Sequence, residues 1–241
     1  MSKPPATSWI IRTYNEQKWL RQVLRALMTQ TRQDFDIIVV DSGSTDNTLE
    51  IVDEFPVKLI EIPHEDFGYS YALNLGIKES QSKYIGILSG HSVPVSNTWY
   101  ADGLVNFSDP RVAGVSGNYL ALPDGAWDEK LGLWLFALTE GKRKKHFDRN
   151  MTNTNSLIRR DRWDEYCFDE RLVNGSEDYD WACEMISRGW DMIKDPKFNV
   201  YHSHGGLGRP SLRQMRPIWK ISNNLIDKRS RPGQSFSKLV K

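Results

Sequence analysis

Three acidic residues stand at the start of a helical pattern late in the chain. Glu177, Asp178 and Asp180 follow Ser176, which we expect to cap the helix N-terminus. The apolar face of this helix consists of Trp181, Ala182, Met185 and Ile186. The helix dipole and the free N–H groups of a first turn favour a charged carboxylate, which suits a general base. The alternative is that acids in a first turn simply favour helix formation, and we adopt that interpretation for Asp180.

Three polar segments, 12–16, 41–48 and 89–92, each follow an apolar run that is typical of a buried strand. The predicted strands are 9–11, 36–40, 57–62 and 84–88, and the predicted helices are 19–27, 49–52, 70–78 and 99–107. This alternation predicts an α/β fold with a mostly parallel, doubly wound central sheet and helices on both faces. Ligands of such sheets bind beyond the carboxyl ends of the strands, where the three polar segments would gather.

The second half of the chain has a less regular pattern. It predicts strands at 112–118, 155–158 and 198–201, an amphipathic helix at 127–140, the acidic helix that Gly189 ends, and a last amphipathic helix at 212–225. The length of 241 residues is sufficient for one large α/β domain but not for two. We therefore expect a single domain built from two unequal halves.

Composition excludes several classes of function. With 32 basic and 31 acidic side chains, the chain gives no electrostatic reason to expect a nucleic acid partner. No apolar run has the character of a signal peptide or the length of a membrane span, so the sequence predicts a cytoplasmic protein.

Taken together, three motifs resemble the family 2 glycosyltransferases of the GT-A fold, which use sugar nucleotides and invert the anomeric centre. The motifs are Ile11-Arg12-Thr13-Tyr14-Asn15-Glu16, the strand end Val40-Asp41-Ser42-Gly43-Ser44-Thr45-Asp46-Asn47-Thr48, and Glu177-Asp178 before an apolar helix. The match extends in order over roughly residues 8–205, which makes it more specific than one motif. It implies a GT-A domain at 1–210, with a nucleotide-sugar half at 1–118 and a smaller acceptor and catalytic half at 119–210. A C-terminal helix and basic tail follow at 211–241.

The resemblance assigns donor-binding roles to residues at the strand ends and on the third helix. These residues are Thr13, Tyr14, Asn15, Glu16, Asp41, Ser42, Asn74, Ser89, Gly90 and His91. Tyr14 is available to stack on the base, and Asp41 to contact the ribose diol or the base edge. Asn74 matches a position that faces the diphosphate or the donor sugar in relatives. The alternative for Asp41 and Asp46 is capping of a turn and a helix, and Asp46 is the better candidate for it.

The segment after the fourth strand departs from the family pattern. Most relatives carry an Asp-any-Asp motif there that holds a divalent cation, whereas this chain has Ser89-Gly90-His91. His91 is either a metal ligand or an imidazolium that neutralises the diphosphate, or the site is degenerate. His202 and His204 alternate at a strand end, and one of them would complete a site for Mn²⁺ or Mg²⁺ with His91. The alternative is a pair of hydrogen-bonded histidines without a metal.

The implied reaction is transfer of a sugar from a nucleoside-diphosphate sugar to a hydroxyl group of a glycan or lipid-linked acceptor, in surface polysaccharide biosynthesis. Asp178 is the predicted base, and Glu177 orients the acceptor or the helix start. A sugar-phosphate nucleotidyltransferase is the first rival, but 12–16 lacks the glycines of a phosphate loop. A catalytically impaired sugar-nucleotide-binding protein is the second, and the presence of Glu177-Asp178 argues against it.

The basic residues near the C-terminus have two interpretations. They either form a solvated face of the helix at 212–225 or bring it into peripheral contact with the inner face of a membrane that carries the acceptor. A homodimer is also left open.

Overall fold

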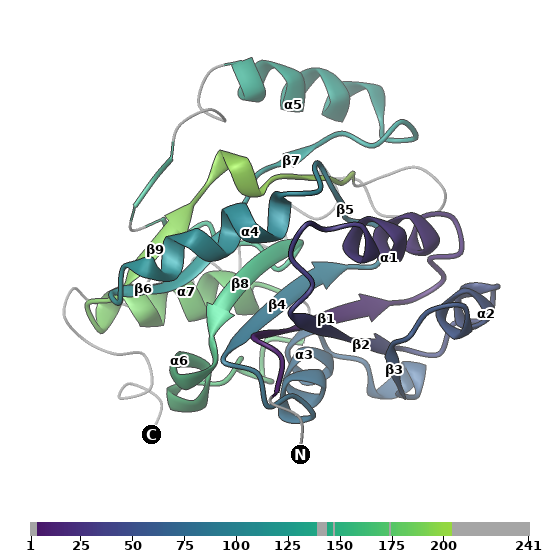
Figure 1. The fold of residues 1–241 in the computed structure, drawn as a ribbon. Helices are drawn as coiled ribbons and strands as arrows, with labels where there is room; N and C mark the ends of the chain where they lie inside the picture. The colour runs from purple at the N-terminus through teal and green to yellow at the C-terminus, as the bar shows by residue number, and fades with distance from the viewer. Residues whose placement is uncertain (1–3, 139–143, 147, 174, 204–241) are drawn as a thin grey trace.

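The protein was analysed as a computed structural model, which describes residues 4–138, 144–146, 148–173 and 175–203. The predicted helix at 212–225, the tail and His204 lie outside these residues. The first half alternates strands and helices as expected (Figure 1): β1 (Thr7–Thr13), α1 (Leu20–Met28), β2 (Phe35–Asp41), α2 (Thr48–Asp53), β3 (Lys58–Glu61), α3 (Tyr69–Lys78), β4 (Tyr84–Ser89), β5 (Val93–Pro94) and α4 (Trp99–Leu104). Short 3-10 turns follow β3 and α4, at His64–Asp66 and Val105–Ser108.

The second half contains more elements than the sequence predicted. They are β6 (Val112–Ser116), β7 (Tyr119–Leu120), α5 (Trp127–Leu138), β8 (Asn155–Arg159), α6 (Arg160–Glu165), α7 (Glu177–Ser187), β9 (Asp191–Lys194), a 3-10 turn at Pro196–Phe198 and β10 (Val200–Tyr201). The predicted strand at 198–201 is therefore a turn followed by a two-residue strand. Strand β9 and helix α6 were not predicted.

The central sheet has seven strands in the order β3-β2-β1-β4-β8-β6-β9. The pairs β1–β2, β1–β4, β2–β3 and β6–β9 are parallel, and β8 runs antiparallel to both of its neighbours. The prediction of a mostly parallel sheet is confirmed. Three short strands, β5, β10 and β7, form a second sheet at one end.

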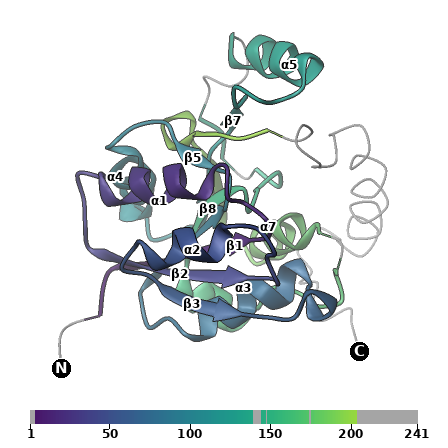
Figure 2. The same ribbon diagram turned by 90° about the vertical axis from the view of Figure 1, so that its right-hand side faces the viewer.

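Helices cover both faces of the central sheet, as predicted. Apolar side chains of α1, α2 and α4 pack on one face, and those of α3, α6 and α7 pack on the other. Figure 2 shows α1 and α3 on opposite sides of the strands β1 to β3. Along β1, Ile11 joins the first cluster and Ile10 the second, because neighbouring strand residues point to opposite faces. Arg12 therefore points to the same face as Ile10.

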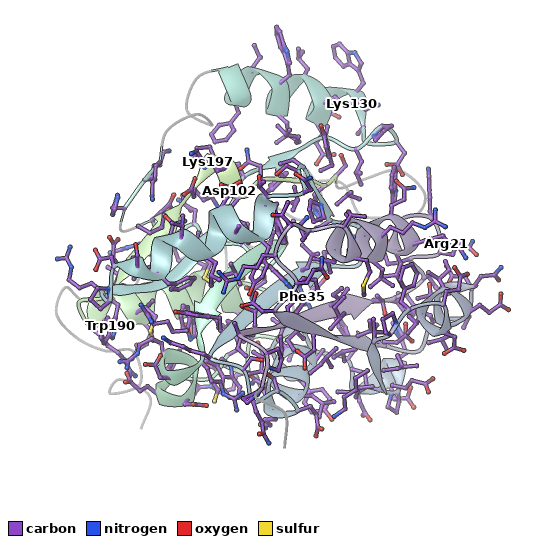
Figure 3. The ribbon with its side chains drawn as sticks, in the orientation of Figure 1. Arg21, Phe35, Asp102, Lys130, Trp190 and Lys197 are labelled. Atoms are coloured by element: carbon purple, nitrogen blue, oxygen red, sulfur yellow. The ribbon has the colours of Figure 1, made fainter. Side chains whose placement is uncertain are left out.

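Helix α5 is an exception to this layering, because it stands apart at one end of the molecule (Figures 1 and 2). We expected an amphipathic helix here, yet Trp127 is 77% exposed and Trp134 is 58% exposed. Figure 3 shows large side chains along its outer side. None of the helices in the described part combines the length and the apolar character that crossing a bilayer requires.

Candidate active site

Hydrogen bonds connect the ends of three strands to the start of α7. Ser42 N–H donates to Thr13 O (3.0 Å), which joins the end of β2 to β1, and Gly90 N–H donates to Arg12 O (3.0 Å), which joins the loop after β4 to β1. Ser89 N–H in turn donates to Thr154 O (3.1 Å).

The next residue of the chain completes this connection. The Asn153 backbone N–H donates to Asp178 Oδ2 (3.0 Å), and the Asn153 side chain donates to Glu177 Oε1 (3.2 Å). The three predicted polar segments and the acidic pair therefore lie together at one edge of the sheet.

The loop after β1 is fastened to the loop after β2. Asn15 adopts a left-handed backbone conformation (φ 55°) and its side-chain oxygen accepts the Thr45 N–H at 2.8 Å. Glu16 N–H donates to the Thr48 hydroxyl at 2.8 Å. Tyr14 stacks on His64, with ring centroids 4.4 Å apart and an interplanar angle of 19°. Tyr14, the residue predicted to stack on the base, thus already has an aromatic partner in His64, for which the sequence predicted no role.

The Asp41 carboxylate organises its own loop. It is 0% exposed, and it accepts hydrogen bonds from two backbone groups, Gly43 N (3.0 Å) and Ser44 N (2.8 Å). It also accepts hydrogen bonds from the hydroxyl groups of Thr13 (2.9 Å) and Ser44 (2.6 Å). This is the turn-capping role that the sequence left as an alternative. A contact between Asp41 or Ser42 and a donor stays a prediction.

The Asn74 amide is engaged in hydrogen bonds within the protein. Its side chain is 2% exposed and donates to Phe168 O (2.8 Å) and to Glu170 Oε1 (2.9 Å), while its oxygen accepts the Trp163 Nε1–H at 3.1 Å. The amide therefore fastens α3 to the segment after α6. Its donors and its acceptor are engaged within the protein, and a contact between Asn74 and a donor stays a prediction.

The histidines do not form the predicted metal site within the described residues. His91 and His202 stack face to face, with centroids 4.5 Å apart and an interplanar angle of 20°. A metal ion lies about 2.1 Å from an imidazole nitrogen in the plane of the ring, so two nearly parallel rings cannot share one ion. His91 Nδ1 lies 2.5 Å from Glu16 Oε1, and His202 Nδ1 lies 3.0 Å from Ser92 Oγ.

Over the residues that the structure describes, no group of three His, Cys, Asp or Glu side chains is arranged to hold a metal ion. His91 and His202, stacked and hydrogen-bonded as they are, do not fit the divalent cation that the family implies, and a site that His204 completes stays a prediction. His204 lies outside the described residues.

The acidic pair has raised proton affinity. Burial and, to a smaller extent, the negative charge of Asp178 raise the pKa of Glu177 to about 7, although the Arg12 cation and the Asn153 side chain lower it. Burial also raises the pKa of Asp178, against the backbone N–H groups of Asn153 and Tyr179 and the charges of Arg12 and Lys194. Such perturbed carboxylates are typical of catalytic sites.

The start of α7 differs from the expectation in one respect. Ser176 does not cap the helix with its side chain, since its backbone is left-handed (φ 75°) and no side-chain capping bond forms. The unusual conformation directs the chain sharply into the helix that carries Glu177 and Asp178.

Two cations near the pair were not assigned from the sequence. Arg12 follows the five buried residues at the start of β1. A charged residue directly after a buried run could have indicated a functional role, but the sequence analysis treated Arg12 only as part of the loop motif. Lys194 lies on the unpredicted strand β9 and donates to Asn150 O at 2.6 Å. Burial lowers the pKa of Lys194 to about 8, although Asp148 and Asp178 raise it.

A cavity of about 470 Å³ lies elsewhere, beside α5. Trp19, Lys130 and Tyr201 contribute to its lining, and neither Glu177 nor Asp178 does. Figure 3 places Lys130 on α5. This cavity is therefore separate from the acidic pair.

Comparison with known proteins identifies the family. Residues 8–166 match Glycosyl transferase family 2, so the chain belongs to this family. Among curated relatives, the glycosyltransferase AglE of Haloferax volcanii is 28% identical over 198 residues, which cover 78% of this chain and 64% of AglE. A Methanococcus voltae protein, named as a diacetamido-dideoxy-glucuronosyltransferase of dolichyl N-acetyl-alpha-D-glucosaminyl phosphate, is 23% identical over 214 residues, covering 82% of this chain and 66% of that protein. The chain thus spans less than two thirds of either relative.

A solved structure confirms the fold. The mannosyltransferase PcManGT of Pyrobaculum calidifontis, in complex with GDP-Man and Mn²⁺, superposes with a TM-score of 0.66 at 18% identity, over 93% of this chain and 70% of that one. The α/β architecture with a mostly parallel sheet is therefore that of GT-A glycosyltransferases. The roles predicted for individual site residues stay predictions.

Proposed function

We propose that this chain transfers a sugar from a nucleoside-diphosphate sugar to a hydroxyl group, with inversion, and that Asp178 is the general base. The observation that carries the proposal is the hydrogen-bonded connection between the strand ends and α7. It supports a donor site of the GT-A type at the strand ends, within reach of the Glu177–Asp178 pair. Membership of the family supports the reaction class.

Asp178 is better placed for the base than Glu177. Asp178 is partly exposed, whereas Glu177 is buried and accepts a hydrogen bond from Asn153. Asp178 also accepts N–H groups from Asn153 and, at 2.8 Å, from Tyr179, which fix the orientation of its carboxylate. Glu177 then acts as a positioning residue that holds the Asn153 loop against the start of α7.

The proposed step is a single displacement. The Asp178 carboxylate takes the proton of the acceptor hydroxyl while its oxygen forms a bond to the anomeric carbon. The bond from that carbon to the diphosphate oxygen breaks, and the nucleoside diphosphate leaves with the electron pair. Attack from the face opposite the leaving group inverts the centre, and no second carboxylate is needed as a nucleophile.

The donor site is proposed at the ends of β1, β2 and β4. Tyr14, with His64 behind it, offers an aromatic surface for the base, and the loops at 13–16 and 41–44 offer polar groups for the ribose. Ser89 and Gly90 border the same place through their bonds to Thr154 and Arg12. The GDP-Man complex of PcManGT supports a sugar nucleotide as the donor class.

The acceptor is proposed to be a glycan or a lipid-linked saccharide of surface polysaccharide biosynthesis, handled on the cytoplasmic side of a membrane. The printed name of the Methanococcus voltae relative, which includes a dolichyl phosphate sugar, supports a lipid-linked acceptor. Contact with the membrane through the helix predicted at 212–225, and a homodimer, stay predictions. Because the ligands offered by the described residues do not fit a divalent cation, no step is assigned to one.

A donor screen tests the proposed function. The protein is incubated with UDP-, GDP- and dTDP-sugars, with and without a mixture of oligosaccharide or lipid-linked acceptors, and each released nucleoside diphosphate is quantified. We expect release from one nucleotide class that rises when the matching acceptor is added. Binding of sugar nucleotides without release by any acceptor would favour the rival hypothesis of a binding protein.

A further inference from the structure

The proposed reaction poses a problem of charge at the strand ends. A departing nucleoside diphosphate carries negative charge that the site must stabilise. Relatives such as PcManGT contain Mn²⁺, but the described residues of this chain offer no group of three metal ligands. His91 and Glu16 pair with each other, and the four hydrogen bonds to Asp41 come from its own neighbourhood.

Arg12 is the cation that the fold places at this point. It pairs in register with Val40 of β2 and with Ser89 of β4, and its carbonyl accepts the Gly90 N–H. Its backbone is thus fixed between the two strand ends that border the proposed donor site. Its guanidinium lies over the ring of Tyr69, at the start of α3, with 4.7 Å to the ring centroid.

The guanidinium has unused hydrogen-bond donors. Its Nε and Nη1 atoms are buried and have no hydrogen-bond partner, and no ion pair joins Arg12 to an acidic side chain in the described part of the chain. Leaving such donors without a partner is costly, so a buried guanidinium of this kind is poised for an anion. Its planar fork matches the oxygens of a phosphate.

The Glu177–Asp178 pair does not supply that anion. The charge of Arg12 lowers the pKa of both carboxylates, but neither carboxylate makes a hydrogen bond or an ion pair with it in the described residues. The guanidinium therefore has no acidic partner in the described part of the chain.

We propose that Arg12 binds the diphosphate of the donor through its guanidinium, and that it is the resident positive charge that stabilises the leaving group in this chain. The inference rests on the proposed function and makes that function independent of a bound divalent cation. It also explains how a chain with Ser89-Gly90-His91 in place of an acidic motif can hold a diphosphate.

The experiment compares the binding of nucleosides and nucleoside diphosphates in EDTA. Calorimetry measures the dissociation constants of uridine, UDP, guanosine, GDP and dTDP for the full chain and for Arg12→Gln, Arg12→Lys and Arg21→Gln. Arg21 is the matched control. It lies on the surface of α1, is labelled in Figure 3, and forms an ion pair with Glu54. Thermal unfolding without ligand checks that each variant is folded.

In the wild type and in Arg21→Gln, we expect the preferred diphosphate to bind in EDTA more tightly than its nucleoside. In Arg12→Gln, we expect the diphosphate to bind roughly 10- to 100-fold more weakly while nucleoside affinity is unchanged, since a hydrogen bond to a charged group is lost. Arg12→Lys should recover part of the loss. A residue that merely supported the fold would weaken both ligands equally.

Two results would overturn the inference. If the diphosphate binds only when Mn²⁺ is present and Arg12→Gln leaves that binding unchanged, the resident charge lies elsewhere while the proposed function survives. If none of UDP, GDP and dTDP binds to the wild type with or without Mn²⁺, the proposed function fails together with the inference.

Discussion

Two acidic sites lie at the same edge of the sheet, and they are built in opposite ways. Asp41 at the end of β2 is buried and accepts four hydrogen bonds from the protein, two of them from backbone N–H groups. Glu177 and Asp178 at the start of α7 are adjacent carboxylates, and burial raises the pKa of each. The hydrogen-bond donors around Asp41 take the place of water. The carboxylates of Glu177 and Asp178 have lost water without a comparable number of donors to replace it.

The difference separates structural from reactive carboxylates. Donors that surround a carboxylate replace the water it loses on folding, so its charge stabilises the loop that provides them. A pair of carboxylates with fewer donors holds protons more tightly, contrary to the expectation that the first helical turn would favour their charged form, and a raised proton affinity helps a base take a proton. Residue type and position at a strand or helix end do not distinguish the two cases, but the hydrogen bonds do.

The largest effect is expected at the reactive site. Asp178→Asn removes the proton acceptor while keeping the shape of the side chain. We expect turnover to fall roughly 10²- to 10⁴-fold, the contribution of a general base, with the affinity for nucleoside diphosphate nearly unchanged. The measurement is nucleoside diphosphate release under single-turnover conditions, alongside calorimetric binding.

Asp164→Asn is the control for that variant, because Asp164 is an exposed residue of α6 that pairs with Arg160. It should retain wild-type turnover. Full turnover in a folded Asp178→Asn protein would show that the base is another residue.

The next effect is expected at the structural site and concerns stability. Asp41→Asn turns one acceptor oxygen into an amide that faces the donors of the same loop. We expect the free energy of unfolding to fall by about 2 to 4 kcal/mol, since buried hydrogen bonds to a charged group are lost. Urea unfolding measures it, with exposed Asp36→Asn on the same strand as the control. A loss of donor binding with unchanged stability would assign Asp41 to the donor instead.

Regular repetition made the first half of the fold predictable. The strands β1, β2 and β4 follow from apolar runs, because parallel strands inside a sheet are buried on both faces, and the helices follow from helical spacing. The edge strand β3 is only partly buried, and its short apolar run still predicted it. Strand β9 was missed because Asp191 and Lys194 flank only two apolar residues, and tertiary contacts rather than local pattern make it a strand.

The site was predictable by position but not by hydrogen bonding. The alternation of strands and helices predicted that the polar segments gather, and the family resemblance predicted that the acidic pair joins them. It did not show that Asn74 bonds to Phe168 and Trp163, or that His91 stacks on His202. These contacts join residues far apart in the chain, and no local spacing encodes them.

A third effect concerns the pH dependence of stability at the reactive pair. The pKa of Glu177 is about 7 in the folded chain, above the ordinary value of about 4.3 in an unfolded chain. The folded state therefore retains a proton that the unfolded state releases, so this contribution to stability is present below about pH 4 and is lost as the pH rises through 7. Asp178, Arg12 and Lys194 are the charged groups that set the balance.

Glu177→Gln removes this titration. We expect the variant to be more stable than the wild type by roughly 1 to 3 kcal/mol at pH 8, and nearly equal to it at pH 4.5. Urea unfolding at the two pH values measures the difference, with the exposed Glu50→Gln as a control. An equal change at both pH values would mean that Glu177 ionises normally.

The smallest effect is expected at Asp46, a partly exposed carboxylate. It has fewer hydrogen-bond donors than Asp41 but is not a member of a buried acidic pair like Glu177 and Asp178. Its Oδ1 accepts the Thr48 N–H at the start of α2 (3.0 Å), and its Oδ2 accepts the Gln17 N–H (3.2 Å). Asn47 is the N-cap residue of α2 and forms no side-chain capping bond, so Asp46, one residue earlier, is the side chain that bonds to the first turn, and its capping role stays a prediction. We expect Asp46→Ala to lower the free energy of unfolding by about 1 kcal/mol, the usual contribution of a helix cap, without changing nucleoside diphosphate release.

Asp53→Ala tests whether that loss comes from the cap or from the charge. Asp53 is exposed at the last residue of the same helix, where a negative charge is unfavourable to the helix dipole. Its removal should leave stability unchanged or raise it slightly. An equal loss of stability in both variants would show that the net charge of α2, rather than the two hydrogen bonds of Asp46, determines the effect. The contrast between carboxylates with many and with few hydrogen-bond donors would then not extend to this loop.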